Sequence, residues 1–487
     1  MNHTHRIQPS LSRGANCATA HLRDSATTSL DCDKRTATHM DKQRKIHDIA
    51  SGEPAPAIRR RYPLILLYAA LIGAIAALFT AAFLTVYNLG IQFFGNPSHF
   101  GLNVNRFWPL ILLTAGGILI GIAIKFTGIH GGLGVAQEQY AKTGRIEPRY
   151  LPSILLEAFI ALFSGAAVGP EGPLSFLTGG VGTWITDHLR IDKEDAALLV
   201  YAAIAGCFGG FFGSPVVGAI GALEYMFIHE LDYYRHLIPG LLAASCGYGV
   251  YWALLRTSLI GTFSFPNYAS PRIIDLLWAL VIGLLCGVIG TAYKVLFAIV
   301  QRIFAPLRQH PIVLAILGGV IIGLIGSFVP LTLYSGQVQL QSLLKSTISY
   351  SALYLLLLLV VKALLTSTSF ATGFDGGPIF PLIFIGGTLG LAIAQIFPFI
   401  PVGVAVMAAM AGTLSAVAPM PLTIALLLGL LGGQADLTPM ITIGAIIGFL
   451  TGKALTSLLP KPRSTTHEAG SDDTHHTVTS AGTPAPA

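Results

Sequence analysis

The sequence predicts an all-α integral membrane protein built from two homologous halves, and three observations support this prediction. Hydrophobic residues make up 53% of the 487-residue chain and charged residues only 11%, whereas about 25% of an average soluble chain is charged. Apolar runs follow one another through residues 62–459, interrupted mainly by glycine and proline. A pattern of glycines and prolines also occurs twice, with an offset of 208 positions between the copies.

The apolar runs have the length of membrane-spanning helices, which need about 20 residues each. Residues 108–124, 276–299, 312–329 and 352–365 are examples. The block 62–459 has room for roughly 14–18 helical pieces, of which some are too short to span a bilayer. Glycine is abundant, with 54 residues in the whole chain, and this is typical of membrane helices that pack closely.

The two ends of the chain are polar and predict its orientation. Residues 1–61 carry eleven Lys and Arg, and Lys461 and Arg463 follow the last apolar run. Because positive charge stays on the cytoplasmic side of a membrane, we expect a multi-pass protein of the cell (inner) membrane. Both termini would be cytoplasmic, which requires an even number of crossings. Segments 1–61 and 460–487 have the composition of disordered tails, and nucleic-acid binding by the basic N-terminal tail is a disfavoured alternative.

The chain shows no pattern expected for a cofactor or a metal. Its five cysteines form no C-x-x-C pair, and three of them lie in apolar segments as small packing residues. The pair His475-His476 falls in the C-terminal tail, where solvated side chains are the expected interpretation. The sequence therefore predicts neither a cofactor nor a metal site.

The repeated pattern has the form G-P-x-x-P-L-x-F-x-x-G-x-x-G. It begins at Gly169 in the first copy and at Gly377 in the second, and seven of its fourteen positions agree without a gap. A second match relates residues 203–219 to the segment 206 positions later. Two matches in the same order predict two homologous halves, about 62–265 and 270–459. Transport proteins with internal repeats bind their substrate where the repeats meet.

Both copies open helices, and their prolines decide which backbone N–H groups stay free there. The first four N–H groups of a helix have no partner inside it, and proline at its first position loses nothing. With Gly169 and Gly377 as the caps, four prolines carry no N–H group: Pro170, Pro173, Pro378 and Pro381. Four residues remain as donors: Glu171, Gly172, Ile379 and Phe380. Free N–H groups at the positive end of a helix dipole bind anions, so the two copies predict an anion site without a full positive charge.

Glu171 is the only carboxylate in the two copies of the pattern. An acidic residue inside the membrane is costly and is a functional candidate by default. At a helix N-terminus its carboxylate would take the place of an anion and would leave when protonated or displaced, which predicts a gate and a proton carrier. A structural cap is the alternative. For Glu157, Lys362 and Asp375 we expect pairing or helix-end roles.

These residues resemble the CLC family of chloride channels and chloride/proton antiporters. The family pattern G-R-E-G-P is matched at residues 169–173 except at Pro170, and the pattern G-x-F-x-P is met loosely from Gly377. The stretch 212–218 is similar to the family's helix after the gate. The resemblance covers the whole apolar block and implies two inverted, structurally related halves of many tilted and broken helices. It also implies a homodimer with one anion path per subunit, in which Glu171 is the outer gate.

The chain departs from the family at three further places, which marks it as a divergent member. The family's serine that faces the central anion is matched by Leu133, which precedes Gly134 and has no side-chain donor. The family's tyrosine near the last helix is matched by Thr456, whose hydroxyl has a shorter reach. The inner proton-accepting glutamate is matched by Tyr225, and Glu224 one residue earlier points about 100° away around a helix. Glu224 stays a candidate for gating or proton transfer.

The predicted function is transmembrane transport of a small inorganic anion, chloride first, through a path gated by Glu171. The residues expected to contact the anion are Glu171, Gly172, Ile379, Phe380, Leu133, Gly134 and Thr456. A path for fluoride or another anion is the near alternative, and passive conduction and proton-coupled exchange both stay open. A membrane enzyme with Glu171 as acid/base is disfavoured, because no set of catalytic partners lies beside it in the sequence. The expected partners are the anion, protons and the lipid bilayer.

Overall fold

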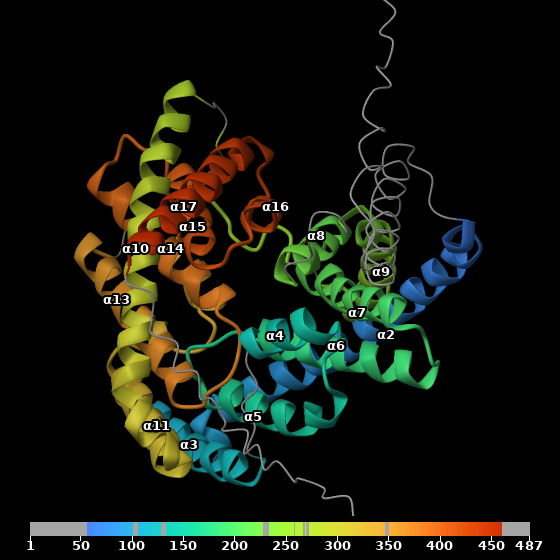
Figure 1. The fold of residues 1–487 in the computed structure, drawn as a ribbon. Coiled ribbons are helices and arrows are strands. Elements are labelled where there is room, and N and C mark those ends of the chain that lie inside the picture. Colours follow the sequence, from blue (N-terminus) through green and yellow to red (C-terminus); the bar gives the residue numbers. More distant parts are fainter. Residues whose placement is uncertain are drawn as a thin grey trace, which may run out of the picture. The chain divides into compact units, whose positions relative to one another are not determined.

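The computed structural model describes residues 56–100, 106–127, 133–226, 233–257, 259–265, 268, 272–345 and 350–459. Within these residues it contains sixteen α-helices and no β-strand (Figure 1). The chain divides into two units, Met1–Ile65 and Leu66–Ala487. Apart from the start of the first helix, the features described below belong to the second unit. The predicted tails, 1–61 and 460–487, lie outside the described residues apart from the start of the first helix.

The helices form two series of eight. The first series consists of α2 (Pro56–Phe94), α3 (Trp108–Thr127), α4 (Leu133–Thr143), α5 (Leu151–Ser164), α6 (Glu171–His188), α7 (Lys193–Phe212), α8 (Pro215–Tyr225) and α9 (Tyr233–Leu255). The second consists of α10 (Ile273–Phe304), α11 (Pro311–Phe328), α12 (Gln337–Lys345), α13 (Ala352–Ala371), α14 (Ile379–Ile396), α15 (Val402–Val417), α16 (Pro421–Gly432) and α17 (Thr438–Leu458). Helices α6 and α14, which carry the two copies of the pattern, are both 18 residues long.

Short 3-10 helices lie between several of these elements: η1 (Pro97–Phe100), η2 (Pro148–Tyr150), η4 (Ala305–Gln309), η5 (Pro330–Thr332) and η7 (Ala435–Leu437). Among the described residues, nine helices are long and apolar enough to cross a membrane, judged by length and composition. Helices α8, α12 and α16, with 11, 9 and 12 residues, are too short to do so. The all-α membrane fold of tilted and broken helices is therefore confirmed, and the number of helices falls within the expected range.

Glycine allows several helix pairs to approach closely. Helices α3 and α11 lie side by side (Figure 1). Gly319 of α11 lies directly against Leu113 of α3, and a Cβ atom added to this glycine would overlap the Leu113 backbone. Gly390 of α14 lies in the same way against Val406 of α15. Such contacts replace side-chain interdigitation with backbone packing, and they explain the glycine content of the chain.

Lys362 of α13 is buried and ties one connection of the second series in place. Its Nζ atom donates hydrogen bonds to the backbone oxygens of Thr332, at 3.0 Å, and Tyr334, at 2.5 Å. The Tyr334 N–H group in turn donates to the Gly165 oxygen, at 3.1 Å, at the end of α5. The lysine thus holds the connection between α11 and α12 by hydrogen bonds to two of its backbone carbonyls.

Candidate functional site

The two copies of the repeated pattern meet in space. Gly169 and Gly377 form an isolated antiparallel bridge, with N–H···O distances of 2.7 Å and 2.6 Å in the two directions. Helices α6 and α14 begin two residues after these glycines, at Glu171 and Ile379. Two helix N-termini that are far apart in the sequence are therefore brought to one place.

The caps of these helices lie one residue later than expected. Pro170 and Pro378, rather than the preceding glycines, are the N-cap residues of α6 and α14. The physical reason is the bridge, because both glycines use their N–H and C=O groups to pair with each other. The first helical residues are consequently Glu171 and Ile379, and their N–H groups are still among those without a partner inside the helix.

The Glu171 side chain fills the anion position predicted at the start of α14. Its Oε1 atom accepts hydrogen bonds from the backbone N–H groups of Ile379, at 2.6 Å, and Phe380, at 3.4 Å. The side chain is completely buried, and its Oε2 atom has no hydrogen-bond partner among the described residues. The carboxylate of one half thus sits at the positive end of a helix dipole of the other half.

The bridge glycines make the space that the carboxylate occupies. A Cβ atom added to Gly169 or Gly377 would overlap the Glu171 carboxyl group. Gly172 lies close to the segment before the second copy of the pattern, since a Cβ atom added to Gly172 would overlap the Gly376 oxygen. Only residues without a side chain fit at these three positions while Glu171 occupies the site.

The other residues predicted to contact the anion are not brought to Glu171 in the same way. The side chain of Leu133 lies outside the described residues, and Gly134 borders open space. Thr456 lies near the end of α17, where its hydroxyl donates to the Gly452 oxygen at 2.6 Å. Thr456 lines a cavity, and Glu171 is not among the residues that line this cavity.

Glu224 forms a second contact between a carboxylate and a helix start. Its two oxygens accept hydrogen bonds from the backbone N–H groups of Leu422, at 3.2 Å, and Thr423, at 2.7 Å. These are residues of the first turn of α16. Glu224 belongs to α8, so two acidic residues of the first helix series each cap a helix of the second.

Two tyrosines lie near Glu171, although the sequence does not indicate either of them as a binding residue. The buried Tyr225 hydroxyl interacts with Ser175 and lies within electrostatic range of Glu171. Ser175 follows Glu171 by one helical turn, and its hydroxyl donates to the Glu171 backbone oxygen at 2.9 Å. Tyr87 of α2 interacts with Ser335 and is also within electrostatic range of Glu171. Ser175 could have been found from the sequence, because residues four apart on a helix are neighbours. No sequence signal indicates Tyr87.

A further acidic pair lies close to the loop that leads to the bridge. The Glu157 Oε1 atom accepts a hydrogen bond from the Thr127 hydroxyl at 3.1 Å. Glu157 is completely buried and interacts electrostatically with Asp375, two residues before Gly377. One oxygen of each of the two acids is buried without a hydrogen-bond partner among the described residues. The electrostatic interaction between these two carboxyl groups is a repulsion between like charges and is not an ion pair.

Comparison with known proteins identifies the class of protein that this fold and site define. Residues 116–453 match the family described as voltage gated chloride channel. The chain belongs to this family, which is the CLC family that the repeated pattern indicates.

Individual relatives agree with this assignment. YfeO from Salmonella choleraesuis (strain SC-B67) and from Salmonella newport (strain SL254), which are named as putative ion-transport proteins, are each 29% identical over 360 residues, covering 72% of this chain and 85% of theirs. The fold is similar to that of a CLC-type fluoride/proton antiporter, with a TM-score of 0.67, 20% identity, and coverage of 82% of this chain and 98% of that one. It is also similar to a slow cyanobacterial Cl⁻/H⁺ antiporter, with a TM-score of 0.68, 20% identity, and coverage of 80% and 94%. These likenesses confirm the two inverted halves of the CLC fold.

Proposed function

We propose that the protein carries a small inorganic anion, chloride first, across the membrane along a path through the Glu171 site. One observation carries the proposal: the Glu171 carboxylate accepts hydrogen bonds from the Ile379 and Phe380 N–H groups. A carboxylate oxygen and a halide compete for the same kind of donor, at the same end of a helix dipole. The side chain therefore behaves as a tethered anion that closes the path. Membership of a transport family favours this function over a membrane enzyme.

The gate opens when the carboxylate leaves its two donors. Protonation removes the negative charge that the helix N-terminus holds, and an incoming anion takes its place at the Ile379 and Phe380 N–H groups. No basic side chain contacts the Glu171 carboxylate among the described residues. A site made of partial charges holds an anion weakly enough to release it again, as rapid passage requires.

Fluoride is the second candidate substrate, and two observations favour it. The family's central serine, a hydroxyl donor, is replaced here by Leu133. The fold also aligns over 98% of the length of a structure described as a fluoride/proton antiporter. Chloride remains the first candidate because the matched family is described by chloride.

Reconstitution into liposomes tests the proposed function. The purified full-length protein is placed in vesicles loaded with chloride, fluoride or nitrate, and anion efflux is followed together with internal pH. We expect efflux of chloride above that of empty vesicles, with proton movement in the opposite direction if exchange is coupled. Faster fluoride than chloride efflux would assign the second candidate. Absence of chloride, fluoride and nitrate efflux would exclude anion transport.

We propose that Glu224 takes part in proton transfer, and Glu224→Gln tests this separately from its capping contact. Glutamine keeps an oxygen that accepts from the Thr423 N–H group, so we expect the melting temperature to stay within about 2 °C. It carries no exchangeable carboxyl proton, so coupled proton movement should fall at least about tenfold while anion efflux persists. Unchanged coupling in vesicles would leave Glu224 only as the cap of α16.

We also propose the assembly that the family resemblance implies and the orientation that the charged ends of the sequence predict. Two copies would associate as a homodimer with one path in each subunit, and both termini would be cytoplasmic in the cell (inner) membrane. Support for the orientation comes from the basic residues at both ends of the apolar block. Cross-linking in native membranes and protease access to tagged termini test the two points.

A further inference from the structure

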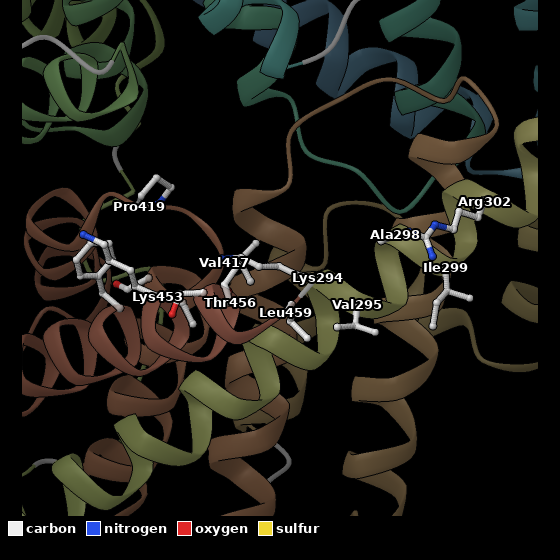
Figure 2. Close-up of a pocket in the computed structure, with 14 residues that line it drawn as sticks. Lys294, Val295, Ala298, Ile299, Arg302, Val417, Pro419, Lys453, Thr456 and Leu459 are labelled. Carbon is white, nitrogen blue, oxygen red and sulfur yellow. The ribbon is translucent and has the colours of Figure 1, made fainter. Parts of the chain in front are cut away.

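A large cavity lies between α10, α17 and the end of α15, away from the Glu171 site. It has a volume of about 910 Å³ and is called the α10/α17 cavity below. Its lining residues are Lys294, Val295, Ala298, Ile299, Arg302, Ser415, Ala416, Val417, Pro419, Phe449, Lys453, Thr456, Ser457 and Leu459 (Figure 2). The lining is thus mainly apolar with three cationic side chains, and Thr456 is the one lining residue that the sequence also predicts as an anion contact.

The three cations of the cavity come from two helices and lack acidic partners. Lys294 and Arg302 belong to α10 and Lys453 to α17, and in Figure 2 Lys294 lies between the other two. Among the described residues, none of the three forms an ion pair. Cations at the ends of membrane helices often extend to the water interface by themselves. That tendency explains a single cation at a helix end. It does not explain why three cations gather around one apolar cavity, where together they create a positive electrostatic field.

Ser415 is the second, independent indication of a ligand. Its side chain is only 1% exposed and lines the α10/α17 cavity. Its hydroxyl group has no hydrogen-bond partner among the described residues. A buried hydroxyl without a partner costs free energy, and an acceptor oxygen on a bound ligand would remove this cost.

The cavity is continuous with an exposed apolar surface of α10. One face of α10 carries exposed side chains at helical spacing, namely Leu277, Val281, Leu284, Val288, Val295 and Ile299, which are between 36% and 56% exposed. The last two of these residues also line the cavity. A lipid chain lying along α10 would therefore reach the cavity without crossing water.

We propose that the α10/α17 cavity binds an anionic phospholipid. The phosphate lies among Lys294, Arg302 and Lys453 and accepts a hydrogen bond from Ser415, and one acyl chain lies along the exposed face of α10. The positive-inside rule places the end of α17 at the cytoplasmic face, and the cytoplasmic leaflet is where basic pockets between helices recruit anionic headgroups. The apolar walls and the opening toward the bilayer favour a lipid over a free anion.

Lipid binding to the full-length protein tests the proposal without any measurement of transport. The protein in mild detergent is titrated with phosphatidylglycerol or phosphatidylcholine, and bound lipid is counted by native mass spectrometry. We expect wild type to prefer phosphatidylglycerol, and the triple variant Lys294→Gln, Arg302→Gln, Lys453→Gln to bind it at least about tenfold more weakly. Ser415→Ala, which changes no charge, should weaken binding about threefold.

A matched variant separates a site from general charge attraction. Lys125→Gln, Lys193→Gln and Lys345→Gln together remove the same charge at the ends of α3, α7 and α12, and this variant should bind phosphatidylglycerol within about twofold of wild type. Equal weakening by the two triple variants would overturn the proposal. So would wild type without a preference between the two lipids.

Two further outcomes distinguish a lipid from a free anion. Millimolar inorganic phosphate should not displace phosphatidylglycerol, and displacement would assign the cavity to a free anion. In vesicles of pure phosphatidylcholine the Lys294, Arg302 and Lys453 triple variant should transport anions like wild type. Loss of transport there would make the cavity part of the anion path. Because lipid counting needs no transport, a failure of the lipid site and a failure of the proposed transport function give different results.

Discussion

Glu171→Gln is expected to abolish proton movement while anion efflux continues. Glutamine cannot carry a proton through a cycle of ionisation, and a neutral amide holds the Ile379 and Phe380 N–H groups more weakly than a carboxylate does. In the liposome assay, coupled proton movement should fall at least about tenfold, and anion efflux should stay within about tenfold of wild type. Internal pH and anion efflux are recorded on the same vesicles.

Glu157→Gln is the matched control for this prediction. Glu157 is also completely buried in the described part of the chain, but its oxygen accepts from the Thr127 hydroxyl and not from a helix N-terminus. We expect this variant to keep coupled proton movement within about threefold of wild type. If Glu157→Gln abolished coupling and Glu171→Gln preserved it, the gate would have to be placed elsewhere.

Gly377→Ala is expected to force the gate out of its site. The added methyl group would overlap the Glu171 carboxyl group, and the backbone at Gly377 does not adopt a positive φ, so alanine itself is allowed there. The carboxylate then loses two charge-assisted hydrogen bonds of roughly 1.5–3 kcal/mol each. Anion efflux at neutral pH should rise at least about tenfold, and coupled proton movement should fall.

A double-mutant cycle keeps this prediction testable if Gly377→Ala folds poorly. Overpacking costs roughly 1–3 kcal/mol, so Gly377→Ala should lower the melting temperature clearly in wild type. It should lower the melting temperature much less beside Glu171→Ala, where the overlapping group is gone. Gly249→Ala, at a glycine with nothing within 4 Å of the added carbon, should change neither stability nor efflux. Equal destabilisation in both backgrounds would mean that Gly377 does not shape the gate.

Some features of the site follow from local chemistry and can be predicted from the sequence. Proline removes its own N–H group wherever it stands, so Pro378 and Pro381 leave Ile379 and Phe380 as the free donors of the second helix start. The structure shows these same two groups engaged by Glu171. The glycine at 377 is recognisable from the sequence as part of a helix start, whereas its pairing with Gly169 is not.

Other features depend on contacts between distant segments. The sequence places Glu224 only by its angle on α8, and its partners are Leu422 and Thr423 in the other half. In the sequence Tyr225 marks the loss of a carboxylate, but in the structure it interacts with Ser175 beside the gate. Thr456 stands in the sequence where the family has a tyrosine, but its hydroxyl donates within its own helix.

The sequence by itself determined the membrane class, the two related halves and the donors that each helix start exposes. These features are set by composition, by repetition and by the local geometry of proline and glycine. Only the tertiary structure decided which acceptor reaches those donors, because Glu171 and Ile379 are 208 positions apart and no local rule relates them. The α10/α17 cavity likewise exists only where two helices and the end of a third leave space between them. The free N–H donors are set by the local geometry of a helix end, whereas the acceptor that binds them is set by the packing of distant segments.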